Sequence, residues 1–301
     1  MTTNGITLKN TVTGEVLELD KITTEAYILE SVFWSEIQGT HHSYKYIGQT
    51  GESVTNTTLE TRDFDIVGWI IADSESSMTE RKKLLNRFFN PQQPVLLVYS
   101  AFNITVKPNT TVSYSENTVE NNDVVCKFKM TCYANDPLWR ANDGFLDVSA
   151  TTLSRFHFPL TLPNPVDAPE YNTFGVRRSN YFVYVTNNGD MPTGMQIKFT
   201  AESQVLNPRL VNANTMEFFG LNMTLRAEES VTVDTNVGQR QVRGVYNGVE
   251  GNYFKYRDFG STWLTADKGV TRFKLEADDN VDGLDVEVRQ YGRFLEVQEC
   301  I

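Results

Sequence analysis

Alternation of apolar and polar residues is the dominant pattern along this chain, and it predicts a mainly β protein. The clearest case spans residues 123–133, where a period of two indicates an antiparallel strand with one buried and one solvated face. Residues 6–9 and 16–20, separated by Thr13 and Gly14, predict an opening hairpin. The apolar positions of the clearest strand are Val124, Cys126, Phe128, Met130 and Cys132.

One predicted strand, residues 64–71, is apolar on both faces. Ile66 and Ile70 point to one side, whereas Val67, Trp69 and Ile71 point to the other. Such a strand is either enclosed within its own domain or has one face covered by another subunit. Val67, Trp69 and Ile71 are therefore candidates for an inter-subunit or core-covering surface.

A single amphipathic helix is predicted at about residues 78–89. Ser77 and Glu80 have the spacing of a capping box, in which two side chains satisfy backbone N–H groups of the first turn. Pro91 ends the helix, because proline disfavours helical geometry at the residue before it. The apolar side chains that fall on one arc of the helix are Met78, Leu84, Leu85, Phe88 and Phe89.

The pattern changes near residue 138. Residues 140–180 are rich in loop-forming residues, and strands resume at 181–185 and recur to the C-terminus at intervals typical of a sandwich or jelly roll. A chain of 301 residues is long enough for two cores. We predict two domains, residues 1–138 and 139–301.

Charge and hydropathy exclude several classes of partner. Lys and Arg number 27 against 38 Asp and Glu, a formal net charge of −11, which argues against a surface built to bind phosphate backbones. The N-terminus shows no cationic stretch followed by an apolar core, and no apolar run approaches the roughly 20 residues of a membrane span. We expect no signal peptide, no membrane partner and no sequence-specific nucleic acid.

The three cysteines predict no disulfide framework. Cys126 and Cys132 lie six residues apart in one strand, about 20 Å at a rise of roughly 3.3 Å per residue. A disulfide needs Cα atoms within about 7 Å, so both are interpreted as core thiols in a reducing compartment. The remaining cysteine is Cys300.

Candidate chemical motifs are weak. Residues 278–283 open like a calcium loop, but its twelfth position is Arg289 rather than a bidentate Glu, so a β-turn is the better interpretation. His41 and His42 are adjacent on an extended segment and point to opposite faces. Nucleophile elbows, zinc-protease motifs and phosphate loops do not occur. We predict no catalytic residue, metal ligand or cofactor, and hence no enzyme.

Two tryptophans leave an alternative function open. Jelly rolls commonly carry lectin sites, and Trp139 or Trp263 could stack on sugar rings, although tryptophans are more often core anchors because of the apolar area that each buries. The alternative function is a carbohydrate-binding module that contacts host cell-wall glycan. An enzyme acting on that glycan would require a pair of acidic residues in a cleft, one with a raised pKa.

Short motifs follow one another in a recognisable order along nearly the whole chain. Those of the first half are Tyr46-Ile-Gly48, Leu59-x-x-Arg62, Phe89-Asn-Pro91 and Asn135-Asp-Pro137-x-Trp139. Those of the second half include Asn188-Gly-Asp190, Pro192-Thr, Val231-x-Val233-Asp234-Thr235, Ser261-x-Trp263-Leu264 and Arg293-Phe-Leu-Glu-Val297. With these motifs the chain resembles the distal tail protein family of long-tailed bacteriophages that infect Gram-positive hosts.

The resemblance implies a fold and a structural role. The implied fold is an N-terminal β-sandwich with one α-helix and a protruding β-hairpin, followed by a C-terminal galectin-like jelly-roll β-sandwich. Six copies would close into a homohexameric ring at the distal end of the tail tube, assembled in the host bacterial cytoplasm and carried at the virion tail tip. The implied partners are the tail tube protein, the tail-tip or baseplate hub or tail-associated lysin protein, the tape measure protein and receptor-binding proteins.

Overall fold

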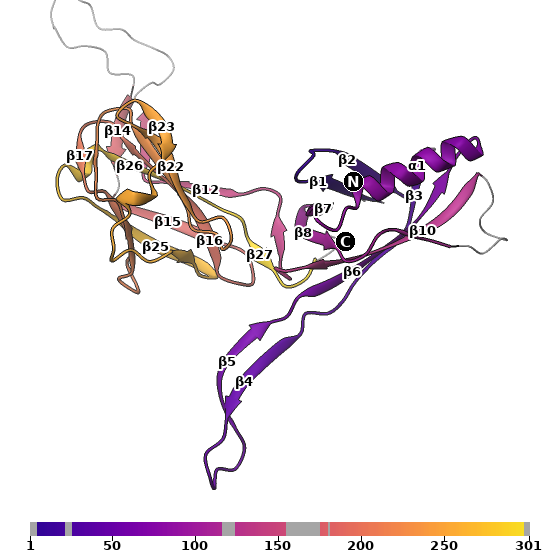
Figure 1. The fold of residues 1–301 in the computed structure, drawn as a ribbon. Helices are drawn as coiled ribbons and strands as arrows, with labels where there is room; N and C mark the ends of the chain where they lie inside the picture. Colours follow the sequence, from indigo (N-terminus) through magenta and orange to yellow (C-terminus); the bar gives the residue numbers. More distant parts are fainter. Residues whose placement is uncertain (1–4, 22–25, 116–123, 155–174, 180, 298–301) are drawn as a thin grey trace, which may run out of the picture. The chain divides into compact units, whose positions relative to one another are not determined.

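The chain folds into two compact units, each with its own apolar core. The computed structural model describes residues 5–21, 26–115, 124–154, 175–179 and 181–297 (Figure 1). The first unit comprises residues 1–142 and 294–301, and the second comprises residues 143–293. The predicted ranges 1–138 and 139–301 differ from this division, because the chain returns to the first unit after Arg293 and thereby makes the second unit an insertion.

The first unit is built on a ten-stranded sheet that closes on itself. Its order is β27-β11-β8-β7-β1-β2-β3-β6-β10-β9, and β8 also pairs with β10. The seven strands from β8 to β10 therefore form a closed barrel. The strands are β1 (Gly5–Asn10), β2 (Val16–Asp20), β3 (Tyr27–Trp34), β6 (Arg62–Ile71), β7 (Val95–Tyr99), β8 (Phe102–Pro108), β9 (Ser113–Tyr114), β10 (Val125–Ala134), β11 (Trp139–Ala141) and β27 (Arg293–Phe294).

The barrel corrects the predicted N-terminal β-sandwich. Closure depends on β10, which pairs with β6 along its whole length and with β8 only through Cys132 and Tyr133. Joining β10 to β8 removes two exposed sheet edges. This contact links positions distant in the chain, so the local alternation of residues does not report it.

The predicted alternation is confirmed where it was clearest. Along β10 the side chains of Cys126, Phe128, Met130 and Cys132 are buried, and both cysteines are free thiols. Val124 precedes the strand and is exposed. Cys300 lies outside the described residues. The opening hairpin is also confirmed, because β1 and β2 pair antiparallel.

Helix α1 (Glu75–Phe88) begins earlier than predicted. Its N-cap is Ser74, whose side chain accepts a hydrogen bond from the backbone N–H of Ser77 at 3.3 Å. Ser77 is therefore the capped residue rather than the cap. Met78, Leu85 and Phe88 are buried in the barrel core, whereas Leu84, predicted on the same arc, is exposed.

A β-hairpin stands apart from the barrel. Strands β4 (Gly39–Tyr44) and β5 (Ser53–Leu59) connect β3 to β6 and pair only with each other, as a separate two-stranded sheet. Figure 1 shows it extending away from the rest of the first unit. Nearly all of its residues are exposed. A protruding hairpin is the feature that the family resemblance implied.

The second unit consists of antiparallel sheets around one core. A seven-stranded sheet has the order β12-β26-β16-β21-β22-β23 with β24 beside β16, and a four-stranded sheet has the order β15-β25-β18-β19. Buried side chains of both sheets, such as Ile197 on β16 and Phe273 on β25, belong to one cluster. The strands of the first sheet are β12 (Phe145–Val148), β16 (Thr193–Ala201), β21 (Ser230–Asp234), β22 (Gln241–Tyr246), β23 (Val249–Asn252), β24 (Thr265–Ala266) and β26 (Leu284–Gln290).

The remaining elements of the second unit are short. The four-stranded sheet contains β15 (Phe182–Asn187), β18 (Arg209–Asn212), β19 (Phe218–Gly220) and β25 (Gly269–Glu276). Two further pairs are β13 (Ala150–Ser154) with β14 (Gly175–Ser179), and β17 (Val205–Leu206) with β20 (Thr224–Leu225). Single 3-10 turns form η1 (Phe254–Tyr256) and η2 (Val281–Gly283).

Candidate interaction surface

The outward side of β6 carries an apolar row at the centre of three paired strands. Trp69 pairs in register with Ile28 on β3 and Lys127 on β10, and residues in register share one face of a sheet. The Lys127 ammonium lies 5.1 Å from the centre of the Trp69 ring. The same ammonium contacts the Glu30 carboxylate at 2.8 Å. The indole is therefore bordered by a charged pair.

Val67 has a similar polar border. It pairs with Ser31 on one side and Lys129 on the other. Lys129 Nζ lies 2.9 Å from Asp65 Oδ2, and the Thr131 hydroxyl donates to Asp65 Oδ1 at 2.7 Å. Burial opposes ionisation of Asp65, but the hydrogen bonds from Lys129 and Thr131 and the Lys129 charge outweigh it and lower the pKa of this carboxyl.

A groove runs along this face of the first unit. Its volume is about 490 Å³, and Phe33, Val67, Tyr114, Lys127 and Lys129 are among its lining residues. Phe33 is 64% exposed, and Ile71 at the end of β6 is also exposed. We use the term outer β6 surface for the set Phe33, Asp65, Val67, Trp69, Ile71, Lys127 and Lys129.

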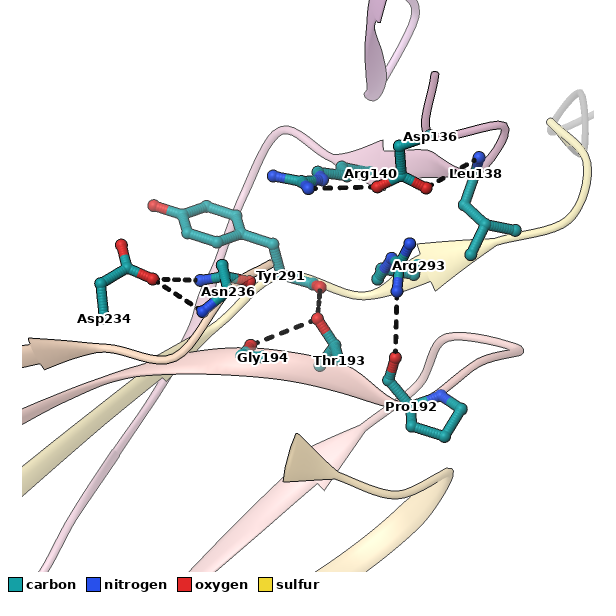
Figure 2. A network of polar contacts seen from close by, with 10 residues as sticks. All are labelled: Asp136, Leu138, Arg140, Pro192, Thr193, Gly194, Asp234, Asn236, Tyr291 and Arg293. Carbon is teal, nitrogen blue, oxygen red and sulfur yellow. Dashed lines mark hydrogen bonds and ion pairs between the residues drawn. The ribbon is translucent and has the colours of Figure 1, made fainter. Parts of the chain in front are cut away.

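Several of the short sequence motifs form turns and strand junctions. In the first unit, Asp136 accepts hydrogen bonds from the Leu138 backbone N–H at 3.4 Å and the Arg140 guanidinium at 3.2 Å, which fixes the turn before β11 (Figure 2). In the second unit, the Thr193 hydroxyl donates to the Tyr291 carbonyl at 2.8 Å, and Asp234 Oδ1 accepts two hydrogen bonds from Asn236 (Figure 2). These motifs thus preserve backbone geometry rather than supply reactive groups.

Two family models match the chain, one in each unit. The phage tail protein RIFT-related domain matches residues 22–129, and the siphovirus-type tail component C-terminal domain matches residues 188–290. The chain belongs to the siphovirus distal tail protein family. It is therefore a structural component of a phage tail tip or baseplate. No curated protein sequence matches this distal tail protein.

Solved structures share the fold along nearly the whole chain. The Dit protein of phage SPP1, described as a paradigm of the hub adsorption apparatus in phages that infect Gram-positive hosts, aligns with a TM-score of 0.62. The alignment covers 96% of this chain and 99% of that one at 14% identity. A chain of the phage P2 baseplate, in its activated conformation with calcium, aligns with a TM-score of 0.55. That alignment covers 96% of this chain and 97% of the baseplate chain, at 9% sequence identity.

The residues predicted on the two-sided strand lie together on the outer β6 surface of this distal tail protein. Ile66 and Ile70 point into the barrel core and are fully buried. Val67 and Trp69 are partly exposed, and Ile71 is exposed. The structure thus places all three candidates outside the core.

The two candidate glycan-stacking tryptophans differ. Trp139 has no exposed surface and packs edge-on against Trp34 and Phe64, at ring-centre distances of 5.4 and 5.8 Å. Its candidacy for sugar stacking is wrong, because no ligand can reach the ring. Trp263, in the second unit, is partly exposed, and its ring centre lies 5.3 Å from that of Phe219.

A contact that sequence reasoning missed ties the C-terminal segment to the barrel. Arg62, fully buried at the start of β6, donates to the Ser35 and Leu295 carbonyls and pairs with Glu296 at 2.5 Å. The Trp34 indole N–H donates to the same Glu296 at 2.6 Å. Both Arg62 and Glu296 occur in motifs that carry the family resemblance, but no local pattern signals that they meet.

The weak chemical motifs resolve as structural contacts. Asp278 pairs with Arg209, and Asp282 accepts a hydrogen bond from the Tyr181 hydroxyl at 2.6 Å. His41 and His42 contact threonine hydroxyls across the hairpin. Within the described residues there is no cluster of three or more potential metal ligands, and no helix has the length and apolar character of a membrane span.

Proposed function

We propose that six copies of this chain close into a ring at the distal end of the phage tail tube and join the tube to the tail-tip or baseplate hub. Family membership supports the location, and the outer β6 surface supports assembly. The barrel closes around its own core, so Val67, Trp69 and Ile71 are not needed to seal it. An apolar centre with charged pairs at its border is the usual composition of a protein interface.

A closed ring requires two different complementary patches on each subunit. The hairpin is the proposed second patch, because its end exposes Tyr46 at 66% and leaves Ile47 fully exposed. The Tyr44 and Tyr46 rings pack edge-on at 4.9 Å, which gives the hairpin end a defined aromatic surface. We place this end against the outer β6 surface of the neighbouring copy.

We propose a different role for each of the two units. The first, with barrel and hairpin, would form the ring, and the second, which we propose to be a galectin-like jelly roll, would face other tail components. Two antiparallel sheets around one core support that fold. The proposed partners are the tail tube protein, the hub or tail-associated lysin protein, the tape measure protein and receptor-binding proteins, with assembly in the host cytoplasm and no catalytic activity.

Native mass spectrometry and electron microscopy of the full chain over a concentration series test the ring. The wild type is expected to form a closed six-membered species. Val67→Lys places a third cation beside Lys127 and Lys129 on the outer β6 surface, so it should raise the concentration needed for assembly at least about tenfold, or roughly 1.4 kcal/mol. Val12→Lys, in the exposed β1–β2 turn, is the matched control and should assemble like the wild type.

Two results would contradict the proposal. The first is a chain that stays monomeric both at high concentration and in isolated tail particles. The second is a ring whose assembly is impaired equally by Val12→Lys and Val67→Lys, since this would assign the effect to added charge rather than to the outer β6 surface.

A specific group of residues favours glycan binding as a second candidate function. In the second unit, the exposed Phe254 and Arg240 and the partly buried Arg257 surround Trp263. Such a group suits a ligand that offers both apolar surface and negative charge.

A further inference from the structure

Trp263 is the base of an exposed aromatic and cationic group in the second unit. On its inner side the indole packs against Phe219, which is fully buried in the core. The Phe254 ring stacks on Trp263 with a centre-to-centre distance of 6.0 Å and an interplanar angle of 30°. Phe254 is 45% exposed. The core therefore fixes one ring, and that ring supports a second ring accessible to solvent.

Two arginines flank these rings. The guanidinium carbons of Arg240 and Arg257 lie 5.2 and 5.6 Å from the centre of the Trp263 ring. Arg257 also lies 5.9 Å from the Phe254 ring, and it donates a hydrogen bond to the Ser261 carbonyl at 3.3 Å. In the described part of the chain, neither guanidinium forms an ion pair with a carboxylate. Both keep N–H groups available for an anion.

The surrounding loop is held firmly. The Phe254 backbone N–H donates to Asn252 Oδ1 at 2.9 Å, and the Asp258 backbone N–H donates to the Gly220 carbonyl at 3.0 Å. On the same loop Phe259 is 96% exposed. A rigid loop that presents exposed aromatic rings loses little conformational freedom when a ligand binds.

We propose that Arg240, Phe254, Arg257 and Trp263, here called the Trp263 platform, bind an anionic polysaccharide. The apolar face of a sugar ring would pack on Phe254, whose underside is supported by Trp263. Carboxylate, sulfate or phosphate groups on the polymer would accept hydrogen bonds from the planar guanidinium groups. Trp263 thus supports and orients the stacking ring, and Phe254 rather than Trp263 makes the stacking contact.

A nucleic acid also combines flat apolar surface with negative charge, but the platform suits it less well. Single-stranded nucleic acids bind in extended basic grooves with several stacking residues. Here two arginines stand on a chain with a net charge of −11. Long-range repulsion disfavours a dense polyanion more than a polymer in which charge is spaced along neutral sugar rings.

Binding of the full chain to three probes tests the proposal. The probes are dextran sulfate of low substitution, in which neutral sugar rings separate the sulfate groups, neutral dextran of the same length and a single-stranded DNA oligonucleotide, compared by biolayer interferometry at fixed salt. We expect dextran sulfate to bind at least about tenfold more tightly than either other probe. Equal binding of DNA and dextran sulfate would overturn the assignment to a polysaccharide. Equal binding of neutral dextran would overturn the role of the arginines.

Variants locate the site. The double variant Arg240→Gln/Arg257→Gln should weaken dextran sulfate binding about tenfold or more, and Phe254→Ala several-fold. Arg272→Gln is the matched control, because Arg272 also lies over an aromatic ring, Phe182 at 5.0 Å, but on the paired strands β25 and β15 rather than in the platform. It should bind like the wild type.

Each remaining outcome contradicts the proposal. An equal loss in Arg272→Gln would show nonspecific attraction to positive charge, and unchanged binding in the platform variants would place the site elsewhere. Near-ultraviolet circular dichroism of each variant checks that the core around Trp263 stays folded. The result is independent of ring formation, because assembly is measured separately.

Discussion

Arg62 and Asp147 are two buried charged groups that differ in their hydrogen-bond partners. The Arg62 side chain is fully buried and has partners on three sides: the Ser35 carbonyl, the Leu295 carbonyl and the Glu296 carboxylate. Asp147 on β12 has one buried carboxylate oxygen, Oδ2, without a hydrogen-bond partner. Partners offset the desolvation cost of a buried charge, whereas a buried charged group without a partner costs free energy.

Removing the partner of Arg62 is expected to destabilise the first unit. Glu296→Ala leaves the buried guanidinium without its carboxylate and should lower the free energy of unfolding by about 2 kcal/mol, as for the loss of hydrogen bonds to a charged group. Glu287→Ala breaks the exposed pair with Lys198 and should cost at most about 0.5 kcal/mol. Urea denaturation of both variants measures the difference. Equal effects would mean that the Arg62 contact contributes no more than a surface pair.

Removing the charge of Asp147 is expected to raise the free energy of unfolding by an amount that depends on pH. Burial raises the pKa of the Asp147 carboxyl above its ordinary 3.8, although a backbone hydrogen bond from Thr186 opposes the shift. The folded state therefore holds this proton more tightly than the unfolded state does, and stability falls as pH rises from about 3.8 through the raised pKa. At pH 7, Asp147→Asn should raise the free energy of unfolding by roughly 1 kcal/mol.

The control for Asp147 is the same change at an exposed position, Asp267→Asn. Thermal unfolding of both variants from pH 3 to pH 7 gives the comparison. The benefit of Asp147→Asn should vanish near pH 3, where the wild-type carboxyl is protonated in both states. A benefit that does not change with pH would contradict ionisation as its cause.

At the scale of elements, local sequence patterns located strands and the helix, but they did not determine that the first sheet closes into a barrel. Period-two alternation located β10, and the turn residues located the β1–β2 hairpin, because both signals act between near neighbours. The β8–β10 pairing joins Cys132 and Tyr133 on β10 to Pro108 and Lys107 on β8, and no local pattern in the sequence signals this contact. Sandwich and barrel share the same alternation, so the sequence alone could not choose between them.

The start of α1 shows the limit of a motif match. Ser77 and Glu80 fit the capping-box spacing, but Ser74 also precedes a helical stretch, and Glu75 then occupies the first turn where an acidic residue interacts favourably with the helix dipole. The sequence pattern predicted the apolar residues of the outer β6 surface, Val67, Trp69 and Ile71, but not its charged border. Of the Trp263 platform it singled out Trp263 alone. Arg240 and Phe254 come from separate loops that meet only through the fold.

The observed cap gives a direct test. Ser74→Ala removes the side-chain oxygen that accepts the Ser77 N–H and should cost about 1 kcal/mol. Ser77→Ala keeps that hydrogen bond and introduces a better helix former, so it should be neutral or slightly stabilising. Urea denaturation measures the free energy of unfolding of both variants. If Ser77→Ala were the less stable of the two, Ser77 rather than Ser74 would be the N-cap.

At the scale of the whole molecule, two separate cores predict two unfolding transitions. A fragment of residues 143–293 contains the complete second core and should unfold cooperatively at the temperature of the second unit in the full chain. A chain truncated after Arg293 loses Phe294 and Glu296, so its first unit alone should be destabilised. Calorimetry combined with hydrogen exchange assigns each transition. A single transition shared by both units would contradict their independence.

The position of β27 beside β11 has a consequence for how such proteins diversify. The chain leaves the ten-stranded sheet of the first unit after β11 and re-enters it at β27, and neighbouring strands are about 4.8 Å apart. Any module whose own ends lie that close can be grafted between them by two crossovers in the gene. The barrel would keep its strand order and its buried arginine, while the inserted module could be exchanged as the host surface changes.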